Sequence, residues 1–201
     1  MTIKLQKDTH DQLVRSIGHY QRPDDRMVDT LTEHYRRLLE LGAAEFPHVA
    51  GSLGPHLLRT ASLLRRWGGR PALCLAGLYH AVYGTDGIRR SLVALDRRGA
   101  IADMIGRDAE SIAYLYGACD RDAFHPRIGI GAPLRFVDRF TLTEYPIEEV
   151  ALRDFCELTL ANELELARSS DAFAIKHRGD IARLARQMRQ LVTANAYDAC
   201  S

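Results

Sequence analysis

The segment Ala72–Tyr79 is apolar on every side of a helix, and it limits the fold more than any other part of the chain. Pro71 fits the first turn of a helix at its start, and Gly68 and Gly69 end the helix before it. A helix without a polar face must be covered on all sides. The sequence therefore predicts that this helix is central and that other helices surround it.

Most of the remaining chain has apolar residues at helical spacing. The expected helices run from Pro23 to about Gly42 and then over residues 55–67, 71–79, 89–98, 108–118, 148–168 and 181–191. Asp108 is the expected cap of its helix. Residues 47–54 and 120–131 are expected to be loops, and no segment alternates as a strand does. We therefore expect residues 23–201 to form a single all-α domain, preceded by an N-terminal extension over residues 1–22.

The charges are nearly balanced, with 27 Lys and Arg against 26 Asp and Glu, which gives a formal net charge of +1. This balance argues against a surface dedicated to nucleic acid or to a polybasic membrane contact. The longest central stretch without Asp, Glu, Lys or Arg, residues 71–85, is too short to span a bilayer. We therefore expect a small molecule as partner, with neither nucleic acid nor membrane. The N-terminal extension leaves a homodimer open.

The four cysteines lie far apart, so they form no CxxC metal knuckle; they are Cys74, Cys119, Cys156 and Cys200. Free thiols are typical of a reducing compartment. The first ten residues, MTIKLQKDTH, lack the apolar run of a signal peptide. The sequence therefore predicts a cytoplasmic protein.

Two histidines mark the ends of neighbouring predicted helices. His56 opens the helix over residues 55–67, and His80 follows the apolar helix. A histidine beside such an apolar helix needs hydrogen-bond partners for its ring nitrogens. Helix ends that meet inside a bundle would bring both imidazoles to one cavity, and neutral imidazole is a common ligand for transition metals. We therefore expect His56 and His80 to converge on a small-molecule pocket.

The segments HLLRTASLL and LAGLYHAVYG together resemble the HD-domain superfamily, in which a histidine begins one helix, a His-Asp pair ends an apolar helix, and a distant Asp lies on a later helix. The resemblance extends over residues 26–168 and implies an HD-domain-like helical bundle with His56 and His80 in the two histidine positions. It also implies a metal-dependent phosphohydrolase or a diiron oxygenase. The chain departs from the pattern, because Ala81 replaces the Asp of the pair. Asn162 takes the later position in preference to Asp138.

Three functions are open for this pocket, and the resemblance favours the first. In it, His56 and His80 bind a divalent transition metal, a third ligand comes from His48, His125 or Glu163, and the ion activates water or dioxygen. His48 and His125 lie in loop-like segments, where a structural role is the usual one. A neutral amide is a poor ligand for a transition metal, so the loss of both carboxylates argues against a binuclear site.

In the second function the enzyme works without a metal. His80 or His56 is then a general acid or base, and Tyr83, Thr85 and Asp86 lie close enough in sequence to orient it. The expected catalytic residues are therefore His80, His56 and Tyr83, and Thr85 is expected to contact the substrate.

Two arginines and one amide complete the expected substrate contacts. Arg59 lies three residues after His56 and shares its helix face, and with Arg121 it is expected to hold a carboxylate or phosphate. Asn162 lies among apolar residues, so we expect it to be partly buried and to orient a group in the pocket. In the third function the domain binds a small molecule without catalysis, since a fold does not fix a function.

Overall fold

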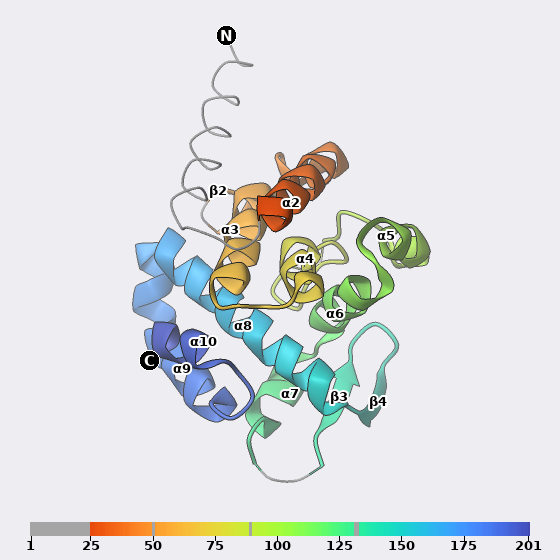
Figure 1. Ribbon diagram of the computed structural model, residues 1–201. Coiled ribbons are helices and arrows are strands. Elements are labelled where there is room, and N and C mark those ends of the chain that lie inside the picture. The colour runs from red at the N-terminus through yellow and green to blue at the C-terminus, as the bar shows by residue number, and fades with distance from the viewer. Residues whose placement is uncertain (1–24, 50, 89, 131–132) are drawn as a thin grey trace.

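The apolar segment forms α4 (Pro71–Tyr79), which lies at the centre of the fold as predicted (Figure 1). The structure is a computed structural model that describes residues 25–49, 51–88, 90–130 and 133–201. Helix α4 packs against α2 (Asp25–Leu38), α3 (Leu53–Arg66), α6 (Arg107–Ala118) and α8 (Glu149–Ser169). Its last two residues, Leu78 and Tyr79, are fully buried, so the bundle is assembled around this helix.

Helices α3 and α4 are antiparallel neighbours that approach each other closely. Their connection turns at Gly68, whose φ of 88° lies in the left-handed region that favours glycine. At Gly77 a Cβ atom would collide with Leu64 Cδ1, so glycine is the residue that allows this approach. The start of α3 therefore meets the end of α4, and these are the two places where His56 and His80 lie.

The other helical elements surround this centre. Helix α8 crosses the molecule, and α9 (Asp171–Met188) and α10 (Ala194–Cys200) pack against it (Figure 1). The shorter elements are η1 (Leu39–Ala43), η2 (Leu95–Arg97), α5 (Arg98–Ile105), α7 (Arg121–Phe124) and η3 (His125–Arg127). The predicted all-α fold is confirmed.

The expectation of no strands is wrong at two places. Strand β1 (Pro47–His48) pairs with β2 (Gly51–Ser52), and β3 (Arg135–Asp138) pairs with β4 (Thr143–Pro146), both antiparallel. Strands of two or four residues are too short for alternation to be visible in a sequence. Each pair is a local hairpin beside the helices, so the fold class is unchanged.

The helix predicted over residues 89–98 is misplaced. Residues 90–94 are not helical, and the helical segment begins at Leu95 and continues through α5. The backbone N–H groups of Leu92 and Val93 both donate to the carbonyl of Val82, each at 3.0 Å. These tertiary hydrogen bonds hold the segment against the chain that leaves α4, and they override the local pattern.

Helix α9 begins at Asp171, well before the start predicted at Ile181. Ser170 caps it by accepting from the backbone N–H of Phe173 at 3.2 Å. The buried residues of α9 lie between Ile181 and Met188, which is why the apolar pattern predicts only the second half of the helix.

Two smaller expectations near α6 and α7 are also wrong. Helix α6 begins at Arg107, directly after Gly106, so Asp108 lies inside the first turn and is not the cap. The expected loop over residues 120–131 contains α7, which Asp120 caps by accepting from the backbone N–H of Ala123 at 3.0 Å. Neither difference affects the arrangement of the central helices, since one concerns the first turn of α6 and the other the segment between α6 and β3.

The extension predicted for residues 1–22 and the boundary at residue 23 lie outside the described residues. All four cysteines are free thiols, as expected from the sequence, and all four are buried. In the part of the chain that the structure describes, no helix combines the length and the apolar character needed to cross a membrane. The cytoplasmic location, the homodimer and the absence of nucleic-acid or membrane partners stay predictions.

Candidate functional site

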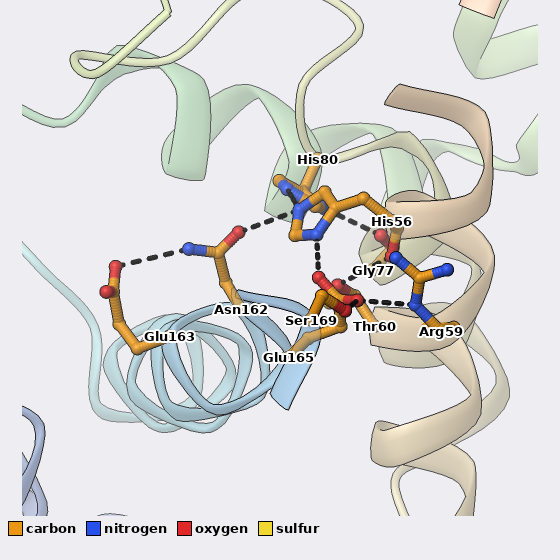
Figure 2. Close-up of polar contacts among 9 residues, drawn as sticks. All are labelled: His56, Arg59, Thr60, Gly77, His80, Asn162, Glu163, Glu165 and Ser169. Atoms are coloured by element: carbon orange, nitrogen blue, oxygen red, sulfur yellow. Dashed lines mark hydrogen bonds and ion pairs between the residues drawn. The ribbon is translucent and has the colours of Figure 1, made fainter. Parts of the chain in front are cut away.

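His56 and His80 converge, as their positions in the sequence predict (Figure 2). Their Nε2 atoms lie 3.3 Å apart, and the rings meet edge to face with centroids 5.2 Å apart. Only 1% of His56 and 2% of His80 is exposed. His56 belongs to the first turn of α3 and His80 follows the last residue of α4, so the close packing of these helices sets the distance.

The backbone fixes the orientation of His80. Its Nδ1 lies 2.7 Å from the carbonyl oxygen of Gly77, so Nδ1 carries the hydrogen and donates it. Burial, with the nearby His56 adding to it, lowers the pKa of His80 to about 3. The ring is therefore neutral near pH 7, and its Nε2 presents a lone pair toward His56.

A carboxylate on α8 holds the other nitrogen of His56. Glu165 Oε2 contacts His56 Nδ1, and Glu165 Oε1 accepts from Arg59 Nε and Ser169 Oγ, both at 2.5 Å (Figure 2). Burial alone would raise the pKa of Glu165, but the hydrogen bond and charge of His56, together with Ser169 and Arg59, lower it to about 2. Glu165 is therefore ionised, and it also forms an ion pair with Arg59.

Asn162, also on α8, contacts the remaining nitrogen of His56. Its Oδ1 lies 3.1 Å from His56 Nε2, while its Nδ2 donates to Glu163 Oε1 at 3.2 Å. The hydrogen bond to Glu163 assigns the orientation of the amide, because only the NH₂ group can donate to a carboxylate. Asn162 is 4% exposed, so it is more deeply buried than the partly buried position that the sequence predicts.

Two polar atoms thus face His56 Nε2. The two neighbours, His80 Nε2 and Asn162 Oδ1, lie 3.3 and 3.1 Å away and both offer lone pairs. A hydrogen bond needs one donor, so His56 is the donor when its Nε2 carries a proton. At the other end of the ring, Nδ1 faces the carboxylate of Glu165 and carries the hydrogen of that contact.

A third histidine joins this group, although its sequence context is typical of a turn. His48 lies on β1, and its ring stacks on that of His56, with centroids 4.2 Å apart and 22° between the planes. Burial, followed by the charge of His56, lowers the pKa of His48 to about 4, so it is neutral near pH 7. We name the group of His48, His56, His80, Asn162 and Glu165 the histidine cluster.

Sequence analysis selects Glu163 from LANELE and misses Glu165. Glu163 lies on the far side of Asn162 from the histidines and faces Arg121 Nη1 at 3.4 Å (Figure 2). Asn162 and Glu165 are three residues apart on α8, so they share a helix face, whereas Glu163 does not. Applying the helical period to LANELE is the signal that would select Glu165.

Tyr83 and Thr85 do not orient His80. The hydroxyl of Tyr83 donates to Glu110 Oε1 at 2.9 Å, and Thr85 Oγ1 accepts from a backbone N–H three residues later at 3.2 Å. The chain turns after α4 and carries both side chains into other contacts. The carbonyl of Gly77 performs the orienting role that the sequence suggests for these residues.

The two candidate substrate-binding arginines form ion pairs with different carboxylates. Arg59 is paired within the histidine cluster, whereas Arg121 donates to the hydroxyl of Tyr116 at 3.0 Å and faces Glu163. The ring of Tyr116 packs edge to face on His80, with centroids 5.2 Å apart. Arg121 therefore reaches the cluster through Tyr116, and the predicted joint clamp of Arg59 and Arg121 is not formed.

Other predicted candidates lie in separate contacts. The His125 ring packs edge to face on a phenylalanine of α8, at 5.9 Å between centroids. Asp138 accepts from the hydroxyl of Tyr114 at 2.8 Å and from two backbone N–H groups of its own turn. Asp86 accepts from the backbone N–H of Arg121 at 3.1 Å. Asn162, and not Asp138, is therefore the late residue that meets the histidines.

The donor set does not match the metal centre that the HD resemblance implies. Ala81 offers no donor atom, and Asn162 offers a neutral amide where a carboxylate is expected. Glu163 and Glu165 are engaged with Arg121 and Arg59. Within the described ranges, no group of three or more His, Cys, Asp or Glu side chains is placed to hold a metal ion.

The comparisons cover the histidines but not α8. A family model described as a domain of unknown function (DUF6817) matches residues 37–121, which include His48, His56 and His80. Asn162 and Glu165 lie beyond the matched residues. No curated protein and no solved structure matches the chain. Over less than half of its length, the chain is similar to this domain family of unknown function.

Proposed function

We propose that this chain is an enzyme that acts on a small molecule without a metal, and that His56 is its general acid–base group. The observation that carries the proposal is the position of His56, with the Glu165 carboxylate at Nδ1 and two lone-pair acceptors at Nε2. A histidine held by a carboxylate on one nitrogen and exchanging a proton on the other is a recurring arrangement in acid–base catalysis.

Each neighbour has a role in proton transfer at His56 Nε2. Glu165 stabilises the protonated ring, which offsets the cost of a charge in a buried site. His80, fixed by its hydrogen bond to Gly77, offers its Nε2 lone pair as an acceptor for the same proton. A substrate atom that enters here replaces His80 or Asn162 as the hydrogen-bond partner of His56.

Arg59 is the proposed contact for the substrate. Its side chain is 38% exposed while its Nε is bound to the buried Glu165, so the guanidinium lies between the cluster and solvent. The terminal nitrogens of an arginine bind a carboxylate or a phosphate in bidentate fashion. The proposed substrate is therefore a small molecule that carries one of these groups.

Metal-dependent hydrolase or oxygenase chemistry is the alternative that the superfamily resemblance favours. One observation supports it: the Nδ1 atoms of His56 and His80 both face acceptors, as they do in metal-binding histidines. The missing carboxylate at Ala81 weighs against it. A non-catalytic domain that binds a small molecule would use the same cluster.

Turnover of a panel of phosphate monoesters and carboxylate-bearing esters tests the proposal. Untagged protein is incubated with each compound, with and without a chelator, and products are detected by mass spectrometry. The control variant for His56→Gln is His177→Gln, on the surface of α9 with its Nδ1 3.8 Å from Asp180. We expect turnover that is unchanged by the chelator and in the His177→Gln variant. In the His56→Gln variant, turnover should be lower by roughly 100-fold or more.

Each other outcome selects a different function. Activity that is lost with the chelator and restored by Zn²⁺ or Mn²⁺ would establish the metal-dependent alternative. Full activity of His56→Gln would contradict the role given to His56. A compound that raises the melting temperature without being converted would favour the binding domain.

A further inference from the structure

His48 stacks on the buried ring of His56 and is itself partly exposed to solvent. The two rings are nearly parallel, with centroids 4.2 Å apart, and only 1% of His56 is exposed. His48 itself is half-buried, and its neighbours Pro47 and Val49 are exposed. The other contacts of the His56 ring are with His80 and with Asn162 and Glu165 on α8, and each of these residues is at most 4% exposed. The ring of His48 is therefore the part of the cluster that covers the outer face of His56.

The local backbone fixes His48 in this place. His48 pairs with Gly51 across the β1–β2 hairpin, and the N–H of Leu53 donates to the carbonyl of Phe46 at 2.9 Å. Gly51 has a φ of 113°, a conformation that L side chains rarely adopt. Because β2 leads directly into α3, the hairpin is tied to the helix that carries His56.

We propose that His48 is a positioning residue that stacks on His56 and controls access to it from solvent. The stacked ring restrains the orientation of the His56 imidazole and occupies the space through which a small molecule approaches its outer face. A ligand reaches His56 when the His48 ring moves aside. This inference rests on the proposed function of His56, although the shielding itself can be measured without any turnover.

Carbethoxylation by diethyl pyrocarbonate, a small electrophile that modifies imidazole, measures this access. The rate at His56 is followed by peptide mass spectrometry at pH 7 in the wild type, His48→Ala and His48→Phe, and His177 in the same samples is the internal reference. We expect His56 to react roughly tenfold faster in His48→Ala, because local opening is no longer required. His48→Phe retains a stacked ring and should react at nearly the wild-type rate.

The reference variant for the hairpin is Gly51→Ala, which strains the backbone at φ 113° while its Cβ meets no atom within 4 Å. It should accelerate the reaction at His56 with His48 still present, and it serves where His48→Ala does not fold, as judged by circular dichroism. Equal rates in wild type, His48→Ala and Gly51→Ala would overturn the proposal, as would a His48→Phe rate as high as that of His48→Ala. If His48→Ala removes the shielding but His56→Gln leaves turnover unchanged, the proposed function alone is rejected.

Discussion

Two buried polar clusters of this protein are each built around a glutamate carboxyl group, but they differ in where their protons lie. In the Glu110 cluster, formed by Tyr83, Arg98 and Glu110, the hydroxyl and the guanidinium donate to the carboxylate at 2.7 to 2.9 Å. Every contact there joins a fixed donor to a fixed acceptor. In the histidine cluster, His56 Nε2 faces two acceptors, so its contacts depend on a proton that can leave.

This difference is the reason why we propose a structural role for the Glu110 cluster and a reactive role for the histidine cluster. Complete hydrogen bonds between permanent partners stabilise a fold and leave nothing to exchange. A ring between a carboxylate and neutral acceptors can take up or release a proton without a change in the surrounding fold. Tyr83 and His80 are close in sequence yet belong to different clusters, because the chain turns directly after α4.

The same substitution in both clusters gives the largest expected contrast. Glu165→Gln should lower the turnover number roughly 100- to 10,000-fold, because a neutral amide does not stabilise a protonated His56. Glu110→Gln should leave the turnover number of the folded protein unchanged. Steady-state kinetics with a converted panel compound measures both, and equal losses would contradict the division into two clusters.

Acid should destabilise the protein through the histidine cluster. The pKa of His80 is about 3 in the folded protein against 6.5 for a solvent-exposed histidine in the unfolded chain, so at intermediate pH the unfolded state binds a proton that the folded state does not. Stability is therefore lost as pH falls below about 6.5, by about 1.4 kcal/mol per pH unit for each such histidine. His48 and His125, lowered to about 4, act in the same direction.

Urea unfolding between pH 7.5 and 5 measures this dependence. The His80→Gln variant should show a shallower decline than the wild type, while His177→Gln should follow the wild type. Glu165 adds a second loss at lower pH, between its ordinary pKa of 4.5 and its folded value of about 2. An unchanged slope in His80→Gln would mean that the neutral, buried state of His80 does not limit stability in acid.

Glu110→Gln should have a moderate effect that is confined to stability. Glu110 is 4% exposed and accepts hydrogen bonds from Arg98 and Tyr83, so the amide leaves at least one donor poorly matched. We expect the free energy of unfolding to fall by about 1 to 3 kcal/mol. Chemical denaturation at pH 7.5 measures the change.

The sequence predicts the centre of the fold better than its edges. Residues 71–79 are apolar throughout and helical in the structure, because burial on every side leaves few alternatives. The segment before η2 is set by the bonds from Leu92 and Val93 to Val82, which no local pattern contains. The first half of α9 is missed for a different reason, because it contributes no buried residue and its sequence therefore shows no apolar stripe.

For the candidate site, the sequence predicts which ends of helices meet but not which side chains complete the contact. His56 and His80 follow from helix ends around an apolar core, and Asn162 from its apolar surroundings. His48 is placed by a two-residue hairpin, which is too short to be recognised. Tyr83 and Glu163 are misassigned because closeness in sequence does not specify the direction of a side chain.

The smallest expected effect on the free energy of unfolding is at an exposed ion pair, which serves as the reference for the buried ones. Glu144 faces Arg127 at 2.8 Å, a distance similar to those around Glu110, but their side chains are 43% and 51% exposed. Water screens an exposed pair, so Glu144→Gln should change the free energy of unfolding by less than about 0.5 kcal/mol. The same denaturation experiment applies to both glutamates. A loss at Glu144 as large as that at Glu110 would show that pairing distance, and not burial, governs these clusters, and the contrast with the histidine cluster would then need another physical basis.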